Sequence, residues 1–239
     1  MKNSTRFLNA FVTIEEYLRQ RTADHNGHLG FSQMLRRVGQ KEQSVRRLEF
    51  DLKEFAQLRN AIIHERAGEE EVIAEPNDLV VTAIEYAAEV ITKPPTVFPL
   101  FQRQVVTITP QSPLKKALKI MYSSGISKLP IVEGGKCVGV LSSNTIARWL
   151  GNCVENEVLN LEETTVEAVQ AFKRKKERYT FGSKDTDLFS AVATFEEYEH
   201  KGQRLLALLL TESGKSNEKI IGIMTLSDLP TAIRQIEGK

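Results

Sequence analysis

The sequence predicts an α+β protein, in which an all-helical N-terminal bundle is followed by two copies of a βαββα unit. Apolar residues recur at three- and four-residue steps as far as Ile91, which is the spacing of amphipathic helices. A proline-rich segment interrupts this spacing, and short β-branched runs then alternate with helical stretches. Within the part of the chain beyond the prolines, one order of residue types occurs twice. We therefore expect a helical domain at 1–95 and a duplicated domain at 96–239.

Four helices account for the N-terminal bundle. The first can be capped by Ser4 or Thr5, and one apolar stripe marks its buried face: Phe7, Phe11, Ile14 and Leu18. A weaker pattern covers 31–38. The third helix opens at Ser44 and continues without a break through a longer stripe: Val45, Leu48, Leu52, Phe55, Leu58 and Ile62. The fourth is capped by Asn77 or Asp78 and buries Val81, Ile84, Ala88 and Ile91.

The segment 93–99 contains three prolines and cannot continue a helix, so we interpret it as a stiff linker. Strands are expected beyond it at 105–108, 129–132, 138–141, 205–210 and 220–224. Gly134 and Gly135 separate the second strand from the third and indicate a hairpin turn.

The second domain is internally duplicated. The segment 112–118 is answered by 186–192, 125–132 by 202–209, and 138–142 by 221–225. The offset grows along the chain, so the second copy contains insertions, the larger one within 212–219. Each copy has an apolar sheet face that it cannot bury alone, and the two copies should therefore pack together. We place them at about 98–155 and about 176–236.

The second copy ends with a glycine, a hydroxyl and a carboxylate in close order: Gly222, Thr225 and Asp228. This ending, with the order of strands and helices, resembles the CBS (cystathionine β-synthase) repeat, which occurs as tandem pairs. The resemblance implies a nucleotide site in which Gly222 admits the ligand to the backbone, Thr225 holds a phosphate and Asp228 accepts hydrogen bonds from the ribose. It also implies that Arg204 faces the phosphates and that the Val106 backbone meets the adenine edge. The implied ligand is AMP, ADP, ATP or a related adenosyl compound, and no further cofactor is required.

The first copy departs from this pattern because Thr145 stands where the second copy has Asp228. Ser142 and Lys128 can still meet a phosphate, so we expect one complete site on the second copy and a degenerate one on the first. A purely structural alternative is that Thr225 caps the helix that follows, with Asp228 favouring the helix dipole from the first turn.

The helical domain contains one motif that suggests a chemical function, formed by Arg59, Asn60 and His64. An Arg followed five positions later by a His resembles the signature of HEPN-type helical bundles, which dimerise and include metal-independent ribonucleases. In RNA cleavage the His would move a proton and the Arg would stabilise the phosphorane charge. Arg59 and His64 lie about 140° apart around a regular helix, so they converge only at a bend or across a two-fold axis. The alternative is structural, with Arg59 in an ion pair and His64 at a helix end.

The amino-acid composition excludes several classes of partner and cofactor. Thirty-two Lys and Arg nearly balance thirty-one Asp and Glu, so no global field favours DNA or a membrane, and we expect neither as a partner. The basic run 173–176 is interpreted as the solvated end of a helix that begins at Thr164 or Thr165, with Glu167 in a capping box. Two cysteines, no ligand-spaced histidines and a charged N-terminus predict a cytoplasmic protein without a metal site.

Three functions remain, and the third of them is a structural adaptor whose two domains hold no ligand. The first is a regulatory protein that binds an adenine nucleotide in the CBS pair and couples binding to the helical domain within a homodimer. The second is a ligand-gated, metal-independent ribonuclease that acts on RNA through Arg59 and His64.

Overall fold

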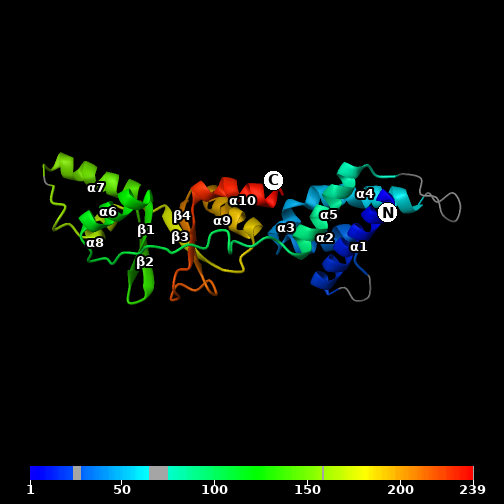
Figure 1. Ribbon diagram of the computed structural model, residues 1–239, viewed down its shortest axis with the longest axis horizontal. Coiled ribbons are helices and arrows are strands. Elements are labelled where there is room, and N and C mark those ends of the chain that lie inside the picture. Colours follow the sequence, from blue (N-terminus) through cyan, green and yellow to red (C-terminus); the bar gives the residue numbers. More distant parts are fainter. Residues whose placement is uncertain (24–27, 65–74, 158, 239) are drawn as a thin grey trace. The chain divides into compact units, whose positions relative to one another are not determined.

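The computed structural model describes residues 1–23, 28–64, 75–157 and 159–238. The chain forms two compact units, Met1–Pro95 and Thr96–Lys239, and combines helices with small sheets (Figure 1). Within the described residues, no helix combines the length and the apolar character needed to cross a membrane.

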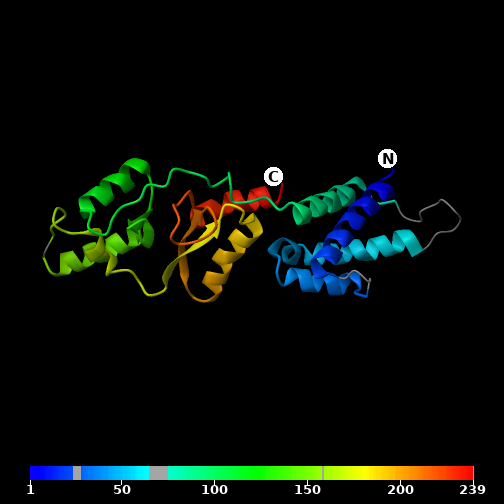
Figure 2. The same ribbon diagram turned by 90° about the horizontal axis from the view of Figure 1, so that it is seen from below.

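The first unit is helical. Its elements are α1 (Asn3–Thr22), α2 (Phe31–Gly39), α3 (Gln43–Arg47), α4 (Glu49–His64) and α5 (Asp78–Thr92). Helix α1 packs against α5 and α2 (Figure 2). The apolar stripes expected for the first and last helices are buried in one core: Phe7, Phe11, Ile14, Leu18, Val81, Ile84, Ala88 and Ile91.

Two details of the helical prediction are wrong and one is confirmed. The run that opens near Ser44 is not continuous, because Leu48 leaves helical geometry at φ −93° and ψ 5°. The side chains on either side of the break, Val45 and Leu52, are both fully buried. Neither Ser4 nor Thr5 caps α1, which begins at Asn3. Asn77 does cap α5, and its side chain accepts a hydrogen bond from the Val80 backbone N–H at 3.0 Å.

The first copy of the repeat contains α6 (Leu114–Ser124), β1 (Lys128–Glu133), β2 (Lys136–Ser142) and α7 (Ser143–Glu155). Strands β1 and β2 form an antiparallel hairpin. Its turn glycines, Gly134 and Gly135, both have positive φ, as a tight hairpin turn requires. The strand predicted at 105–108 is reduced to one parallel bridge between Ile108 and Ile131. A short helix, α8 (Val166–Gln170), follows and packs on α6 and α7.

The second copy contains β3 (Glu177–Ser183), α9 (Leu188–His200), β4 (Arg204–Thr211) and β5 (Gly222–Met224), followed by η1 (Leu226–Asp228) and α10 (Leu229–Ile236). Its sheet has the order β3-β4-β5, with β3 parallel to β4 and β4 antiparallel to β5. Helices α9 and α10 lie together beside this sheet (Figure 1).

Equivalent positions of the two copies have the same local structure. Leu114 and Leu188 each begin the first helix of a copy. Gly125 and Gly202 each stand between this helix and the next strand with left-handed backbones, at φ +62° and +65°. Glycine adopts this conformation without steric cost, so the aligned pair marks one structural feature that occurs twice.

Each copy is completed by the segment that precedes the other. Ahead of the second copy, Thr165 bridges Pro113 of the first copy. Ahead of the first copy, Thr96 bridges Asp187 and Gln102 bridges Gly222, both in the second copy. We call 96–103 the lead-in segment. It begins four residues after α5 ends, and it packs on the second copy before the chain enters the first.

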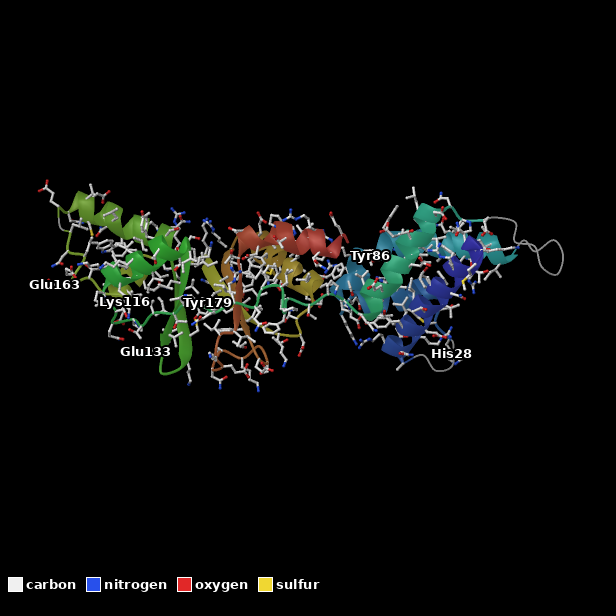
Figure 3. All side chains as sticks on the ribbon, in the orientation of Figure 1. His28, Tyr86, Lys116, Glu133, Glu163 and Tyr179 are labelled. Carbon is white, nitrogen blue, oxygen red and sulfur yellow. The ribbon has the colours of Figure 1, made fainter. Side chains whose placement is uncertain are left out.

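An apolar cluster joins the copies. Val140 of β2 lies in the same buried group as Leu206, Ala207, Leu209, Ile220 and Ile223 of the second copy. Tyr179 of β3, labelled in Figure 3, packs against this group and meets Phe181 edge to face at 5.8 Å between ring centroids. The expectation that the duplicated halves share a core is therefore realised in this unit.

Candidate functional site

The motif at the end of the second copy forms a helix start. The carboxylate Oδ2 of Asp228 accepts hydrogen bonds from the Thr225 backbone N–H at 2.7 Å and from its hydroxyl at 2.9 Å. The backbone N–H of Asp228 donates to the Thr225 carbonyl at 2.9 Å. This reciprocal capping is the geometry of the structural alternative considered for these two residues.

The other carboxylate oxygen of Asp228 is held by Arg103 of the lead-in segment. Arg103 Nη2 lies 3.1 Å from Asp228 Oδ1 and also donates to the Ile223 carbonyl. The sequence did not indicate Arg103, because its partner lies on the far copy and no local spacing links them. A ribose that uses Asp228 must therefore share this carboxylate with Arg103.

Gly222 is required by the backbone of the lead-in segment. A Cβ atom at this position would lie 2.5 Å from the Phe101 carbonyl oxygen and 3.0 Å from Leu210 Cδ1. The contact explains the glycine without a ligand, since Gln102 pairs with Gly222 at the same point. The approach predicted for a ligand is thus occupied by the chain itself.

Lys128 lies within electrostatic range of both Arg204 and Asp228. Lys128 begins β1 of the first copy and is half-buried, whereas Arg204 begins β4 of the second. Burial lowers the pKa of the Lys128 ammonium, the charge of Arg204 lowers it further, and the Asp228 carboxylate opposes both effects. The two cations come from different copies, so their proximity depends on the packing of the repeats.

A cavity of 580 Å³ opens beside Arg204. Four cationic side chains line it: Arg148, Arg174, Lys176 and Arg204. Thr225 and Asp228 are not among its lining residues. The carboxylates on its wall are Glu177 and Glu199, and the Glu177 side chain is only 3% exposed and already paired with Arg148 at 2.7 Å. The remaining cations give the cavity a positive character that suits an anionic ligand.

Arg148 contacts Thr145, the first-copy residue that stands where the second copy has the Asp228 carboxylate. Its Nη2 donates to the Thr145 hydroxyl at 3.2 Å and its Nε to the Phe172 carbonyl at 2.9 Å. Thr145 is fully buried, and its backbone N–H is capped by the Ser142 hydroxyl at 3.1 Å. The first copy therefore closes with the same kind of cap as the second, without a carboxylate.

The interpretation of the basic run 173–176 is wrong. The preceding helix α8 ends at Gln170, so these residues do not form a helix end. Thr165 does cap α8, as expected, and accepts from Ala168 N–H at 3.2 Å. Beyond the helix the chain turns, and Arg174 and Lys176 reach the cavity beside Arg204. Sequence spacing did not indicate this because the partners lie on α7 and at the start of β4.

Val106 lies outside the helices and strands, two residues before Ile108, and its own side chain is 42% exposed. Its neighbours Val105 and Thr107 line a smaller cavity of 250 Å³ together with Val132, Cys137 and Ile220. Burial raises the pKa of the Cys137 thiol, which keeps this side chain neutral. The apolar side chains of this lining suit a flat, uncharged ring, and Glu218 and Lys219 also line the cavity.

In the helical unit, Arg59 and Asn60 contact each other. The Arg59 guanidinium lies 5.7 Å from the centre of the Phe11 ring, and its Nη1 donates to Asn60 Oδ1 at 3.2 Å. The backbone of His64 ends α4, and its side chain lies outside the described part of the structure. Helix α4 runs without interruption from Glu49 to His64, so Arg59 and His64 lie on one helix. The contact with Phe11 favours a structural role for Arg59.

The described residues contain no group of three or more His, Cys, Asp or Glu side chains that could hold a metal ion. The charged side chains that line the cavity beside Arg204 are mostly cations, which bind anions.

Residues 87–152 match the family model of the CBS domain. The match begins within α5, covers the lead-in segment and includes nearly all of the first copy. It confirms the CBS resemblance over this part of the chain. No curated protein sequence matches the chain.

Several solved CBS structures are similar to the chain. One is a putative signal-transduction protein with CBS domains from Burkholderia ambifaria, with 23% identity over 55% of this chain and 84% of that chain, at a TM-score of 0.41. Another is CBSX2 in complex with AMP, with 18% identity over 60% of this chain and 98% of that chain, at a TM-score of 0.43. A third is the CBS domain pair of protein MJ0100 with 5′-methylthioadenosine and S-adenosyl-L-methionine, with 18% identity over 59% and 98% and a TM-score of 0.44.

Proposed function

We propose that the unit Thr96–Lys239 binds an adenosine-type nucleotide and that binding regulates the helical unit. One observation carries the proposal: Arg204 lines a cavity with further cations, and Lys128 of the other copy lies within electrostatic range of Arg204. The CBS family match over 87–152 supports the same conclusion.

The electrostatics favour an anionic ligand. Lys128 is half-buried near Arg204, and both burial and this like charge disfavour its ammonium form. A phosphate between the two side chains would add the missing negative charge and would draw on the planar donor fork of Arg204. Arg148 contributes less, because its guanidinium is already committed to Glu177 and Thr145.

The sugar and the base would lie away from these cations. Asp228 keeps acceptor capacity beyond its bonds to Thr225 and Arg103, since a carboxylate offers about four lone-pair sites. The backbone of Val106, next to the cavity at Val105 and Thr107, remains the proposed contact for the adenine edge.

The lead-in segment provides a route for regulation. It follows α5 directly, and Arg103 within it contacts Asp228 at the proposed ribose site. A ligand that competes for Asp228 would weaken this contact and loosen the segment that follows α5 in the chain. Regulation further requires that the ligand favour one arrangement energetically, because equal affinity for two arrangements shifts neither.

A ligand panel tests the proposal. The full chain would be mixed with AMP, ADP, ATP, S-adenosylmethionine and cyclic dinucleotides, and its thermal unfolding followed. AMP and S-adenosylmethionine come first because the CBSX2 and MJ0100 structures contain them. A ligand at a hundredfold excess over its Kd stabilises the bound state by about 2.7 kcal/mol, which is readily measured. Stabilisation that Asp228→Ala removes supports the proposal, and no stabilisation by any of these compounds at millimolar concentration contradicts it.

The ribonuclease function of the helical unit stays a hypothesis, as does the homodimer that would pool Arg59 and His64 from two chains. It predicts RNA cleavage in the presence of EDTA that His64→Ala abolishes. Cleavage that EDTA stops, or that survives both Arg59→Ala and His64→Ala, would exclude it.

A further inference from the structure

The helical unit has a basic surface around the turn between α2 and α3. A cavity of 600 Å³ is lined by Arg36, Arg46 and Lys53, with Gln40 on its wall. A second cavity of 320 Å³ is lined by Arg21, Arg37 and Lys41, and Gln40 lines it too. The two cavities share Gln40 and together are lined by six cations, which we call the α2–α3 basic surface.

Few of these cations are neutralised. The two carboxylates on the cavity walls are already paired, Glu42 with Arg21 at 3.2 Å and Glu49 with Lys53 at 2.6 Å. Arg36, Arg37, Lys41 and Arg46 are exposed, and none of them forms an ion pair with a carboxylate of the described residues. A local excess of four positive charges attracts a polyanion, although the chain as a whole carries a formal charge of only +1.

An exposed aromatic ring lies on the helix that supplies Lys53. Phe50, the second residue of α4, is 74% exposed. Phe50 and Lys53 are three residues apart within α4, which is the spacing of neighbours on a helix surface. Arg46 and Lys53 line the same cavity on either side of the break at Leu48, which keeps the two positions adjacent.

We infer that the α2–α3 basic surface binds single-stranded nucleic acid. Arginine forks bind phosphate oxygens in two places at once, and four unpaired cations offer a track for successive phosphates. The Phe50 ring offers a stacking platform for a base that is not held in a duplex. The aromatic ring favours a single strand over an acidic protein surface, since stacking on a base uses the ring face itself.

Fluorescence anisotropy of the full chain tests this inference. Labelled single-stranded RNA, single-stranded DNA and the corresponding duplex would be titrated across a series of salt concentrations. Four phosphate contacts predict that log K falls with log salt at a slope of about −3 for a single strand. The variant Arg36→Gln/Arg46→Gln should flatten this slope by about 1.4. The matched control is Lys116→Gln/Lys119→Gln on α6, which removes two exposed lysines from the other unit and should leave the slope unchanged.

The aromatic contact has its own variants. Phe50→Ala should weaken single-strand binding about tenfold, with little change in affinity for the duplex, and Phe50→Tyr should restore it. Circular dichroism and melting temperature would confirm that each variant is folded. Three results would each overturn the inference: no salt-dependent binding, equal loss of binding in the α6 control, or a Phe50→Ala variant that binds every strand like the wild type. The relative affinities for RNA and DNA identify which strand is the natural ligand.

Discussion

Arg103 and Asp228 join the beginning of one repeat to the end of the other. Their side chains meet at 3.1 Å although 125 positions separate them in the chain. Arg103 also donates to the Ile223 carbonyl, so the guanidinium ties the lead-in segment to both β5 and the following helix start. The pair is partly exposed, which limits its contribution to stability.

A double-mutant cycle measures this link. We expect Arg103→Met and Asp228→Asn each to destabilise the repeat unit, with a coupling energy of about 0.5–1 kcal/mol. Trp149, the chain's single tryptophan, lies in α7, so its fluorescence during urea unfolding reports on this unit. Strictly additive effects would show that the two side chains do not interact.

Gly222→Ala should destabilise the repeat unit. The added methyl would lie 2.5 Å from the Phe101 carbonyl, and forcing the lead-in segment away costs about 1–3 kcal/mol. Gly151→Ala is the matched control, because nothing lies within 4 Å of a Cβ there and the residue is within a helix. This control should gain up to about 1 kcal/mol, from better helix propensity. Equal unfolding midpoints for the two variants would refute the packing assigned to Gly222.

Arg148→Met should be among the most damaging substitutions in this unit. It leaves the Glu177 carboxylate buried without a cation, a loss of about 3 kcal/mol or more. The double variant Arg148→Met/Glu177→Leu should recover much of the loss, because it removes the buried charge as well. Both are measured by urea unfolding with Trp149 fluorescence. If the double variant is no more stable than the single one, the damage does not come from the stranded carboxylate.

Glu218 gives the loop between β4 and β5 a pH dependence. Hydrogen bonds from the Ser213 hydroxyl and backbone N–H lower the pKa of this carboxyl from 4.5 to about 2. A depressed pKa means that the contact stabilises the loop fully above about pH 4.5 and is lost as the pH falls towards 2. NMR titration of the Glu218 carboxyl checks the value, and Ser213→Ala should raise it. A midpoint near 4.5 in the wild type would show that the hydrogen bonds are not formed in solution.

Local patterns in the sequence predicted local structure well. The stripes of α1 and α5, the hairpin glycines and the aligned pair Gly125 and Gly202 follow from spacing and backbone conformation, which neighbouring residues determine. The break at Leu48 was not predictable from a stripe that continues across it. The reduction of the strand expected at 105–108 was not predictable either. The lead-in segment just before it pairs with the second copy, and only Ile108 bridges to the first.

The candidate site was only partly predictable for the same reason. Lys128 and Arg204 were recognised through their places in the two copies, and the fold brings them near each other. Arg103, Arg148, Arg174 and Lys176 were missed because their roles depend on contacts between copies. The exchange of preceding segments places each of them beside residues that are remote in the chain.

The most direct test of the nucleotide site is a calorimetric titration of AMP into the wild-type chain and into Lys128→Met/Arg204→Gln. We expect saturable, submillimolar binding by the wild type and a loss of at least tenfold in the variant, since each charge-assisted hydrogen bond contributes about 1.5–3 kcal/mol. Lys116→Gln/Lys119→Gln, which changes exposed lysines on α6, should bind AMP like the wild type. Equal affinity in the wild type and the Lys128/Arg204 variant, or no binding by either, would contradict the account.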